Sequence, residues 1–212
     1  VKVMGRMDIA ERRVAQDGRA TERIGDRPID LRISTFPTNY GERAVLRLLD
    51  NSRRLCDFGA LGMPRDLADG FLECASRANG IVLVTGPTGS GKTTTLYSTL
   101  RRIASSDRNV MTIEDPIEFV FTHDRSIITQ REIGTDTATF PDALRAALRQ
   151  DPDVIMVGEM RDLETVDTSL KAAETGHLVF STIHPADVAS TINRLASFFP
   201  ADDTLQVRTS IS

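Results

Sequence analysis

Short apolar runs recur through the second part of the chain, and each is followed by a stretch with helical spacing of its apolar residues. Runs such as those at residues 80–85 and 154–157 are apolar almost throughout, which is typical of strands buried on both faces of a parallel sheet. The amphipathic stretches between them predict helices that cover those faces, so the fold class is α/β. We expect strands at 80–85, 109–114, 153–157 and 177–183, helices at 91–104, 139–150, 163–174 and 186–197, and a hairpin-like stretch at 117–130.

The first fifty residues have a different pattern. Alternating stretches at 19–24, 27–35 and 42–49 are separated by glycine and proline turn signals, which predicts an antiparallel meander. Strand character at 1–4 and a short helical stretch at 9–14 precede it. The change of pattern predicts one domain at 1–55, which includes a linker, and a second at 56–212. We expect the first to lack its beginning and the second to lack its end, because residues 202–212 read as the start of a further helix.

Composition narrows the class of protein. A hydrophobic content of 40% is enough for a core, and a net charge of −4 is far from the basic balance of a nucleic-acid motor. Residues 1–55 nevertheless carry twelve basic against eight acidic residues, which indicates either a solvated face or arginines directed at phosphate. Cys56 and Cys74 match no metal-ligand spacing, which favours a reduced compartment. No signal peptide or membrane-spanning run is present, so we expect a cytoplasmic protein without direct membrane insertion.

A glycine-rich loop joins the strand at 80–85 to the helix at 91–104. It fits the phosphate-binding P-loop pattern, in which backbone N–H groups and a helix N-terminus point at a polyphosphate. Lys92 would contact the β- and γ-phosphates, and the Thr93 hydroxyl would bind Mg²⁺. A glycine-rich turn before an ordinary helix is the alternative, and both flanking elements argue against it. The expected ATP-binding residues of this loop are Gly86, Pro87, Thr88, Gly89, Ser90, Gly91, Lys92, Thr93 and Thr94.

Charged residues follow the other predicted strands. Glu114 ends the second strand and is followed by Asp115 and Glu118, Glu159 comes after the third strand and His184 after the fourth. In a parallel sheet these strand ends meet at the edge where ligands bind. Carboxylates there can hold Mg²⁺, directly or through water, and can orient or deprotonate an attacking water. Capping of the following turn would explain any one of these acids, but several of them beside a P-loop favour a catalytic site.

The motifs resemble those of the secretion ATPases that drive type II secretion and type IV pili. Residues 112–118 are similar to the Asp box of that family, and residues 151–162 to its atypical Walker B motif, which ends in Gly-Glu. Residues 175–184 are similar to its His box, and the opening segment resembles the end of its N-terminal domain. The resemblance covers nearly the whole chain in the expected order. It implies a RecA-like P-loop NTPase domain preceded by part of a small PAS-like α+β domain.

The resemblance also implies roles for individual residues. Arg32 and Arg47 match arginines that approach the phosphates when the two domains close, and Thr93 and Glu159 match the Mg²⁺ ligands. For two positions a structural role is also open: Arg145 could pair with surface acids, and His177 could satisfy a helix C-terminus. Asp187 is expected to be a helix N-cap. The implied catalytic residues are Glu159, Glu114, Asp115, Glu118, His184, His177, Arg32 and Arg47, and the further nucleotide-binding residues are Arg145, Arg161 and Arg194.

The function implied is that of an ATP-hydrolysing motor that powers type II secretion or the assembly or retraction of type IV pili. We expect a homo-oligomer, a hexameric ring, that acts through an inner-membrane platform protein, lies at the inner membrane through partners and binds no nucleic acid. Two alternatives are a type IV secretion ATPase that moves protein–DNA substrates and a nucleotide-gated assembly switch without turnover. The acidic balance argues against the first, and the presence of Glu159 and an intact Asp box argues against the second.

Overall fold

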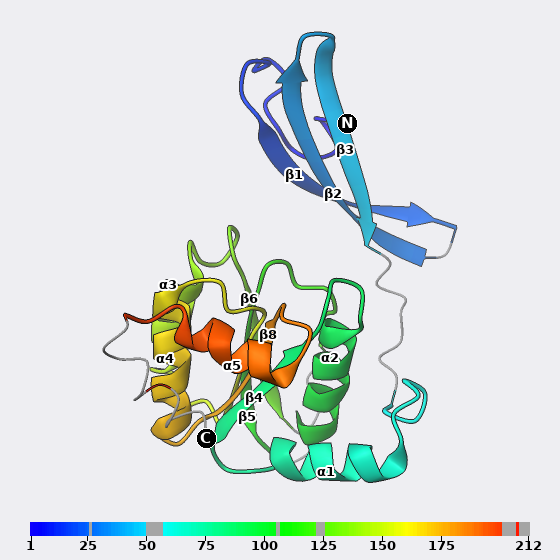
Figure 1. The fold of residues 1–212 in the computed structure, drawn as a ribbon. Helices are drawn as coiled ribbons and strands as arrows, with labels where there is room; N and C mark the ends of the chain where they lie inside the picture. Colours follow the sequence, from blue (N-terminus) through cyan, green and yellow to red (C-terminus); the bar gives the residue numbers. More distant parts are fainter. Residues whose placement is uncertain (26, 50–56, 105–106, 122–125, 201–206, 208–212) are drawn as a thin grey trace. The chain divides into compact units, whose positions relative to one another are not determined.

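The structure is a computed structural model of the 212-residue chain. It describes residues 1–25, 27–49, 57–104, 107–121, 126–200 and 207. The chain divides into two compact units, Val1–Arg54 and Leu55–Ser212, and each unit is described by itself (Figure 1). The assignment of the first unit to a PAS-like domain stays a prediction.

The first unit is built on an antiparallel sheet in the order β1-β2-β3. Side chains alternate between its faces, as the pleat of a strand requires. Leu31 and Ile33 on the central strand are buried and pack with Met7, whereas Arg32 between them lies on the opposite face. The meander predicted from the turn signals is therefore confirmed. The strands are β1 (Gln16–Ile24), β2 (Arg27–Thr38) and β3 (Gly41–Leu49).

The segment before β1 corrects two predictions. Residues 1–4 lie in turns and residues 9–14 form no helix, so the strand and the short helix predicted there are wrong. Local side-chain hydrogen bonds replace helical ones. The Asp8 carboxylate accepts from the Ala10 N–H at 2.8 Å, and the Gln16 amide donates to the Glu11 carbonyl at 3.0 Å.

The second unit contains a five-stranded sheet in the order β4-β8-β7-β5-β6, in which every neighbouring pair is parallel. The central strand β7 and its neighbour β8 are buried along their whole length. The parallel sheet predicted from the apolar runs is therefore confirmed. The strands are β4 (Gly80–Thr85), β5 (Asn109–Glu114), β6 (Ile127–Glu132), β7 (Val154–Val157) and β8 (Leu178–Ile183).

Helices cover both faces of this sheet, so the unit has three layers (Figure 1). Residues of β7 alternate between the two cores: Ile155 and Val157 pack with α3, α4 and α5, whereas Val154 and Met156 pack with α1 and α2. None of the described helices is long and apolar enough to cross a membrane. The helices are α1 (Arg65–Ala75), α2 (Lys92–Ile103), α3 (Phe140–Ala147), α4 (Leu163–Glu174) and α5 (Val188–Ala196).

Two features differ from the sequence-based expectation. The stretch predicted to form a hairpin at 117–130 instead leads into β6, which is parallel to β5 with Asn109 opposite Ile127. Helix α1 was not predicted; no side chain caps its start at Pro64, and Gly70 weakens the helical signal in its middle. The helix expected at 202–212 lies outside the described residues, apart from Val207.

Candidate nucleotide-binding and catalytic site

The glycine-rich loop lies where the carboxyl end of β4 turns into the first residue of α2. Gly86, Gly89 and Gly91 have φ of 142°, 82° and 92°, a region in which a side chain would be strained. Gly91 is also the N-cap of α2, and glycine has no side chain with which to occupy the first N–H groups of the helix. Those donors, together with the helix dipole, are available to an anion.

The Lys92 side chain folds back across this loop. Its ammonium donates to the Gly86 carbonyl at 2.8 Å and to the Pro87 carbonyl at 3.0 Å. Both contacts hold the positive charge beside the backbone donors that the loop presents. The loop therefore combines a cation with a helix N-terminus, which is the chemistry that a polyphosphate requires.

Glu159 lies at the same edge of the sheet, two residues after β7. Its carboxylate accepts a 2.5 Å ion-pair contact from Arg161 and lies 3.5 Å from the His184 Nε2. The side chain of Glu159 is only 13% exposed, whereas those of Arg161 and His184 are 66% and 57% exposed. Three predicted site residues, Glu159, His184 and Arg161, are thus brought together.

Gly158 explains why the glutamate of this motif follows a glycine. The Gly158 N–H donates to the Ile113 carbonyl at 2.8 Å, so the ends of β7 and β5 run close together. A Cβ at this position would lie 3.3 Å from that carbonyl oxygen and 3.5 Å from the Cα of Glu114. Thr182 on β8 donates to the Gly158 carbonyl at 2.7 Å, and together these bonds fix the backbone that carries Glu159.

The three acids of the Asp box are placed differently. Asp115 and Glu118 are exposed, whereas Glu114 is 3% exposed. The Glu114 carboxylate accepts from the Thr112 hydroxyl at 2.5 Å, from the Gln130 amide at 3.2 Å and from the Tyr97 hydroxyl. Burial raises the pKa of Glu114 above its usual value. Within the described part of the chain, Asp115 and Glu118 are the Asp-box acids that solvent can reach.

The raised pKa of Glu114 predicts a pH-dependent stability. The unfolded-state value is about 4.3, so the protonated carboxyl stabilises the fold below that pH, and this contribution is lost as pH rises through the folded-state value. Glu114→Gln carries no titrating group at this position, so it should not lose stability there as the pH rises. The melting temperature of this variant minus that of the parent should therefore increase from pH 4 to pH 8. The exposed Glu174→Gln on α4 is the matched control and should follow the parent. A melting difference for Glu114→Gln that does not change with pH would contradict the prediction.

His177 lies away from this group of residues within the second unit. It immediately precedes β8, whereas His184 immediately follows it, so the strand separates the two histidines. The His177 N–H donates to the Ala172 carbonyl at 3.1 Å, its Nδ1 lies 3.1 Å from the same oxygen, and its carbonyl accepts from the Gly80 N–H at 3.1 Å. These contacts fix the end of α4 to the start of β4, and a role for His177 in sensing phosphate stays a prediction.

The remaining predicted arginines have local partners. Arg145 forms ion pairs with Asp142 at 2.6 Å and with Glu164. These are the pairs with surface acids that the sequence offered as a structural role for this residue. The guanidinium of Arg194 lies 4.5 Å from the centre of the Phe198 ring. Their roles in nucleotide binding stay predictions. Asp187 accepts from the Ser190 N–H at 2.8 Å as the N-cap of α5, so that prediction is confirmed.

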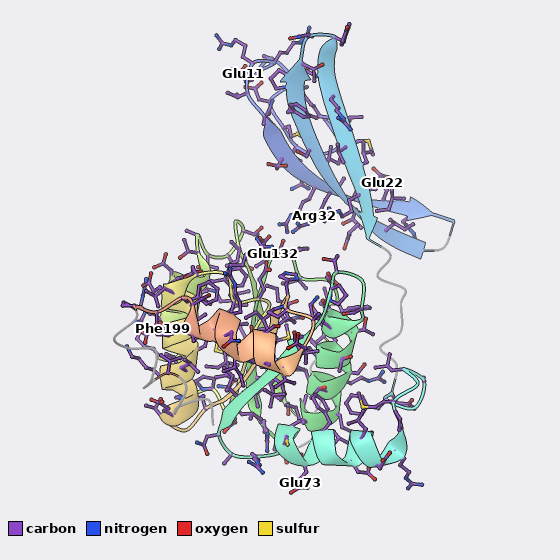
Figure 2. The ribbon with its side chains drawn as sticks, in the orientation of Figure 1. Glu11, Glu22, Arg32, Glu73, Glu132 and Phe199 are labelled. Carbon is purple, nitrogen blue, oxygen red and sulfur yellow. The ribbon has the colours of Figure 1, made fainter. Side chains whose placement is uncertain are left out.

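In the first unit, Arg32 and Arg47 are directly opposite each other on β2 and β3 (Arg32 is labelled in Figure 2). Arg19 on β1 is opposite Arg32, so three arginines form one row across the sheet and share a face. Sequence reasoning did not single out Arg19 as a site residue, because its place in the row depends on strand register. It also missed Tyr97 and Gln130, whose hydrogen bonds to Glu114 join residues far apart in the sequence.

The loop, the helix N-terminus and the acid after another parallel strand of the same sheet are the features of a P-loop nucleoside triphosphatase fold. The strand that carries Glu159 is separated from the P-loop strand by β8, which is the RecA-like order. The chain belongs to the family described as type II/IV secretion system protein, which matches residues 1–211. The family and the RecA-like fold predicted from the motifs are thereby confirmed.

Relatives of this chain include secretion and pilus ATPases. It is 52% identical over 196 residues to the type II secretion system ATPase E of Vibrio cholerae, covering 92% of this chain and 38% of the relative. It is 49% identical over 196 residues to the type IV pilus assembly ATPase PilB of Thermus thermophilus, covering 92% and 22%. The crystal structure of the pilus retraction motor PilT with bound ADP matches with a TM-score of 0.83 and 47% identity, covering 94% of this chain and 56% of that one. The chain therefore spans less than half the length of these two curated relatives.

Proposed function

We propose that the protein containing this chain is an ATP-hydrolysing motor that powers type II secretion or the assembly or retraction of type IV pili. The observation that carries the proposal is that the Lys92 loop and Glu159 follow strands that end at the same edge of the parallel sheet, in a chain 52% identical to a secretion ATPase. We further propose that residues 1–55 are part of a PAS-like domain and that residues 56–212 are the ATPase domain.

The loop residues and α2 would bind the triphosphate of ATP. Lys92 would neutralise the β- and γ-phosphate oxygens, and the N–H groups at the start of α2 would donate to them. Bound Mg²⁺ would neutralise charge that develops on the phosphates. Thr93 and Glu159 supply oxygen donors that suit Mg²⁺, which is usually held by one or two protein groups together with phosphates and water. Consistent with that mode, the described residues contain no cluster of three or more His, Cys, Asp or Glu side chains that could hold a metal.

The acids of the site would orient the attacking water and accept its proton. Glu159 is held between Arg161 and His184, which fixes the direction of its carboxylate. Asp115 and Glu118 follow β5 at the same edge and are exposed. Acids in such positions accelerate proton transfer by about 10²–10⁴-fold.

The arginine row of the first unit would supply positive charge to the phosphates in the assembled protein. Arg32→Ala and Arg47→Ala should each lower the ATPase rate about tenfold or more in the whole protein, because removal of one positioned charge weakens transition-state stabilisation. The melting temperature should change little. The measurement is phosphate release per folded molecule.

Arg43→Ala is the matched control for this pair. Arg43 lies on the same strand as Arg47, is exposed, and pairs in register with Phe36 outside the row. It should leave hydrolysis unchanged. If Arg32→Ala and Arg47→Ala reduce melting temperature and leave the rate per folded molecule intact, the two arginines only stabilise the sheet.

The family comparisons favour a type II secretion or pilus motor over a type IV secretion ATPase. This chain is 52% identical to a type II secretion ATPase and 49% identical to a type IV pilus assembly ATPase. We propose that the motor is a hexameric ring that uses ATP and Mg²⁺ and works through a platform protein at the inner membrane.

A genetic experiment tests the proposed function. Deletion of the gene in its host should abolish either the release of exported proteins or the formation or retraction of surface fibres. The parent gene should restore that phenotype, and a Lys92→Ala gene expressed at the same level should not. A deletion strain with normal secretion and normal fibres would overturn the proposal.

A further inference from the structure

A group of three polar side chains, two of them buried and the third partly buried, links the nucleotide-binding helix to the Asp-box loop. Its members are Tyr97 on α2, Glu114 at the end of β5 and Gln130 on β6, and we call it the Tyr97 clamp. Tyr97 is fully buried, one helical turn after Thr93. Its hydroxyl donates to the Glu114 carboxylate, and Gln130 donates to the same carboxylate at 3.2 Å.

The clamp holds the backbone of the loop that carries Glu118. The Tyr97 hydroxyl accepts from the N–H of Glu118 at 3.2 Å and from the N–H of Phe119 at 3.3 Å. Gln130 donates to the Phe119 carbonyl at 2.9 Å and accepts from the Phe121 N–H at 2.7 Å. The loop is therefore fixed on two sides, by the helix and by the edge strand.

Aromatic packing encloses these hydrogen bonds. The Tyr97 ring meets the Phe119 ring edge-on and stacks on the Phe121 ring, with 5.1 Å between centroids in both pairs. Such contacts exclude water and strengthen the polar network that they surround. Burial raises the pKa of Tyr97, so the phenol stays a donor. Glu114 is 3% exposed and its carboxylate is occupied by Tyr97, Thr112 and Gln130, so it is poorly placed to contact a substrate water.

We propose that the Tyr97 clamp is a positioning device that couples the nucleotide-binding helix α2 to the Asp-box loop and thereby aims the Glu118 carboxylate at the reacting phosphate. Glu114 acts as the buried acceptor of this clamp and does not contact the attacking water. The inference rests on the proposed ATPase function and assigns roles to Tyr97, Gln130 and Glu114 within it.

A double-mutant cycle in the whole protein tests the coupling. Tyr97→Phe keeps the ring but removes the hydroxyl that serves both Glu114 and the Glu118 N–H. It should lower kcat about tenfold or more while the dissociation constant of a non-hydrolysable ATP analogue changes less than about twofold. In a Glu118→Ala background the same substitution should change kcat less than about twofold, because the group that it positions is absent.

Three further variants separate positioning from loss of fold. Gln130→Leu releases the loop from its other side. It should lower kcat about as much as Tyr97→Phe does, and it should likewise have little effect on kcat in the Glu118→Ala background. This variant therefore keeps the test valid if Tyr97→Phe does not fold. Glu114→Gln preserves an acceptor for the Tyr97 hydroxyl and should keep kcat within about threefold of the parent, whereas a general base would lose about 10²-fold or more. Ser98→Ala is the matched control, since Ser98 is buried next to Tyr97 and its hydroxyl has no partner among the described residues.

The outcomes are distinct. Three results would each overturn the inference while leaving the ATPase function intact. The first is that Tyr97→Phe lowers kcat equally with and without the Glu118 side chain, and the second is that Tyr97→Phe and Gln130→Leu both keep the kcat of the parent. The third is that Glu114→Gln lowers kcat about 10²-fold. A parent protein that binds the ATP analogue but releases no phosphate would remove the proposed function itself, and the inference with it.

Discussion

Lys92→Ala is expected to abolish ATP hydrolysis and to weaken nucleotide binding about tenfold or more. The ammonium is the cation of the loop, held by the Gly86 and Pro87 carbonyls beside the helix N-terminus, and loss of a positioned charge at a phosphate site costs about 10²–10³-fold in rate. Isothermal titration with a non-hydrolysable ATP analogue gives the affinity, and phosphate release gives the rate.

Lys171→Ala is the matched control for this substitution. Lys171 lies on α4 in a surface ion pair with Asp167 at 2.6 Å, a pair of the kind that contributes about 0.3–0.5 kcal/mol. The control should bind the analogue as the parent does. Unchanged affinity in Lys92→Ala would contradict the assignment of the loop as the phosphate site.

Glu159→Gln is expected to retain nucleotide binding while its turnover falls about 10²–10⁴-fold, because the amide keeps the shape of the side chain and removes the charge. Its partners Arg161 and His184 have side chains that are 66% and 57% exposed, so water can solvate them once the charge is removed, and the loss should not come from unfolding. Single-turnover hydrolysis separates the chemical step from product release.

The exposed Glu174→Gln on α4 again serves as the control and should hydrolyse ATP at the parent rate. If Glu159→Gln also turns over at the parent rate, Glu159 has a structural role. The proton would then be accepted by an exposed Asp-box acid, and Glu118→Gln should show the loss instead.

The sheet and the P-loop could be predicted from sequence because their signals are local. A buried parallel strand is an apolar run, and the loop needs glycine at particular backbone conformations such as that of Gly91, with φ of 92°. Strand β6 could not be predicted in this way. It is an edge strand in which exposed Ile127 and Thr129 alternate with buried Ile128, and its parallel pairing with β5 depends on a crossover and not on a turn.

The candidate site was predicted in its acids but not in its supporting contacts. Glu114 was expected to be catalytic because it ends a strand at the ligand edge, yet whether a carboxyl at that position is buried depends on partners from α2 and β6. Arg19 joins Arg32 only through the register of β1 and β2. Contacts between residues that are far apart in the sequence depend on packing, and a local sequence pattern does not predict them.

Steady-state release of inorganic phosphate from ATP and Mg²⁺ by the whole protein tests the central claim most directly. The parent should show saturable release that disappears in Lys92→Ala and persists in Lys171→Ala. A parent that binds the ATP analogue tightly but releases phosphate no faster than Lys92→Ala would contradict the account, and would instead identify a nucleotide-gated assembly switch without turnover.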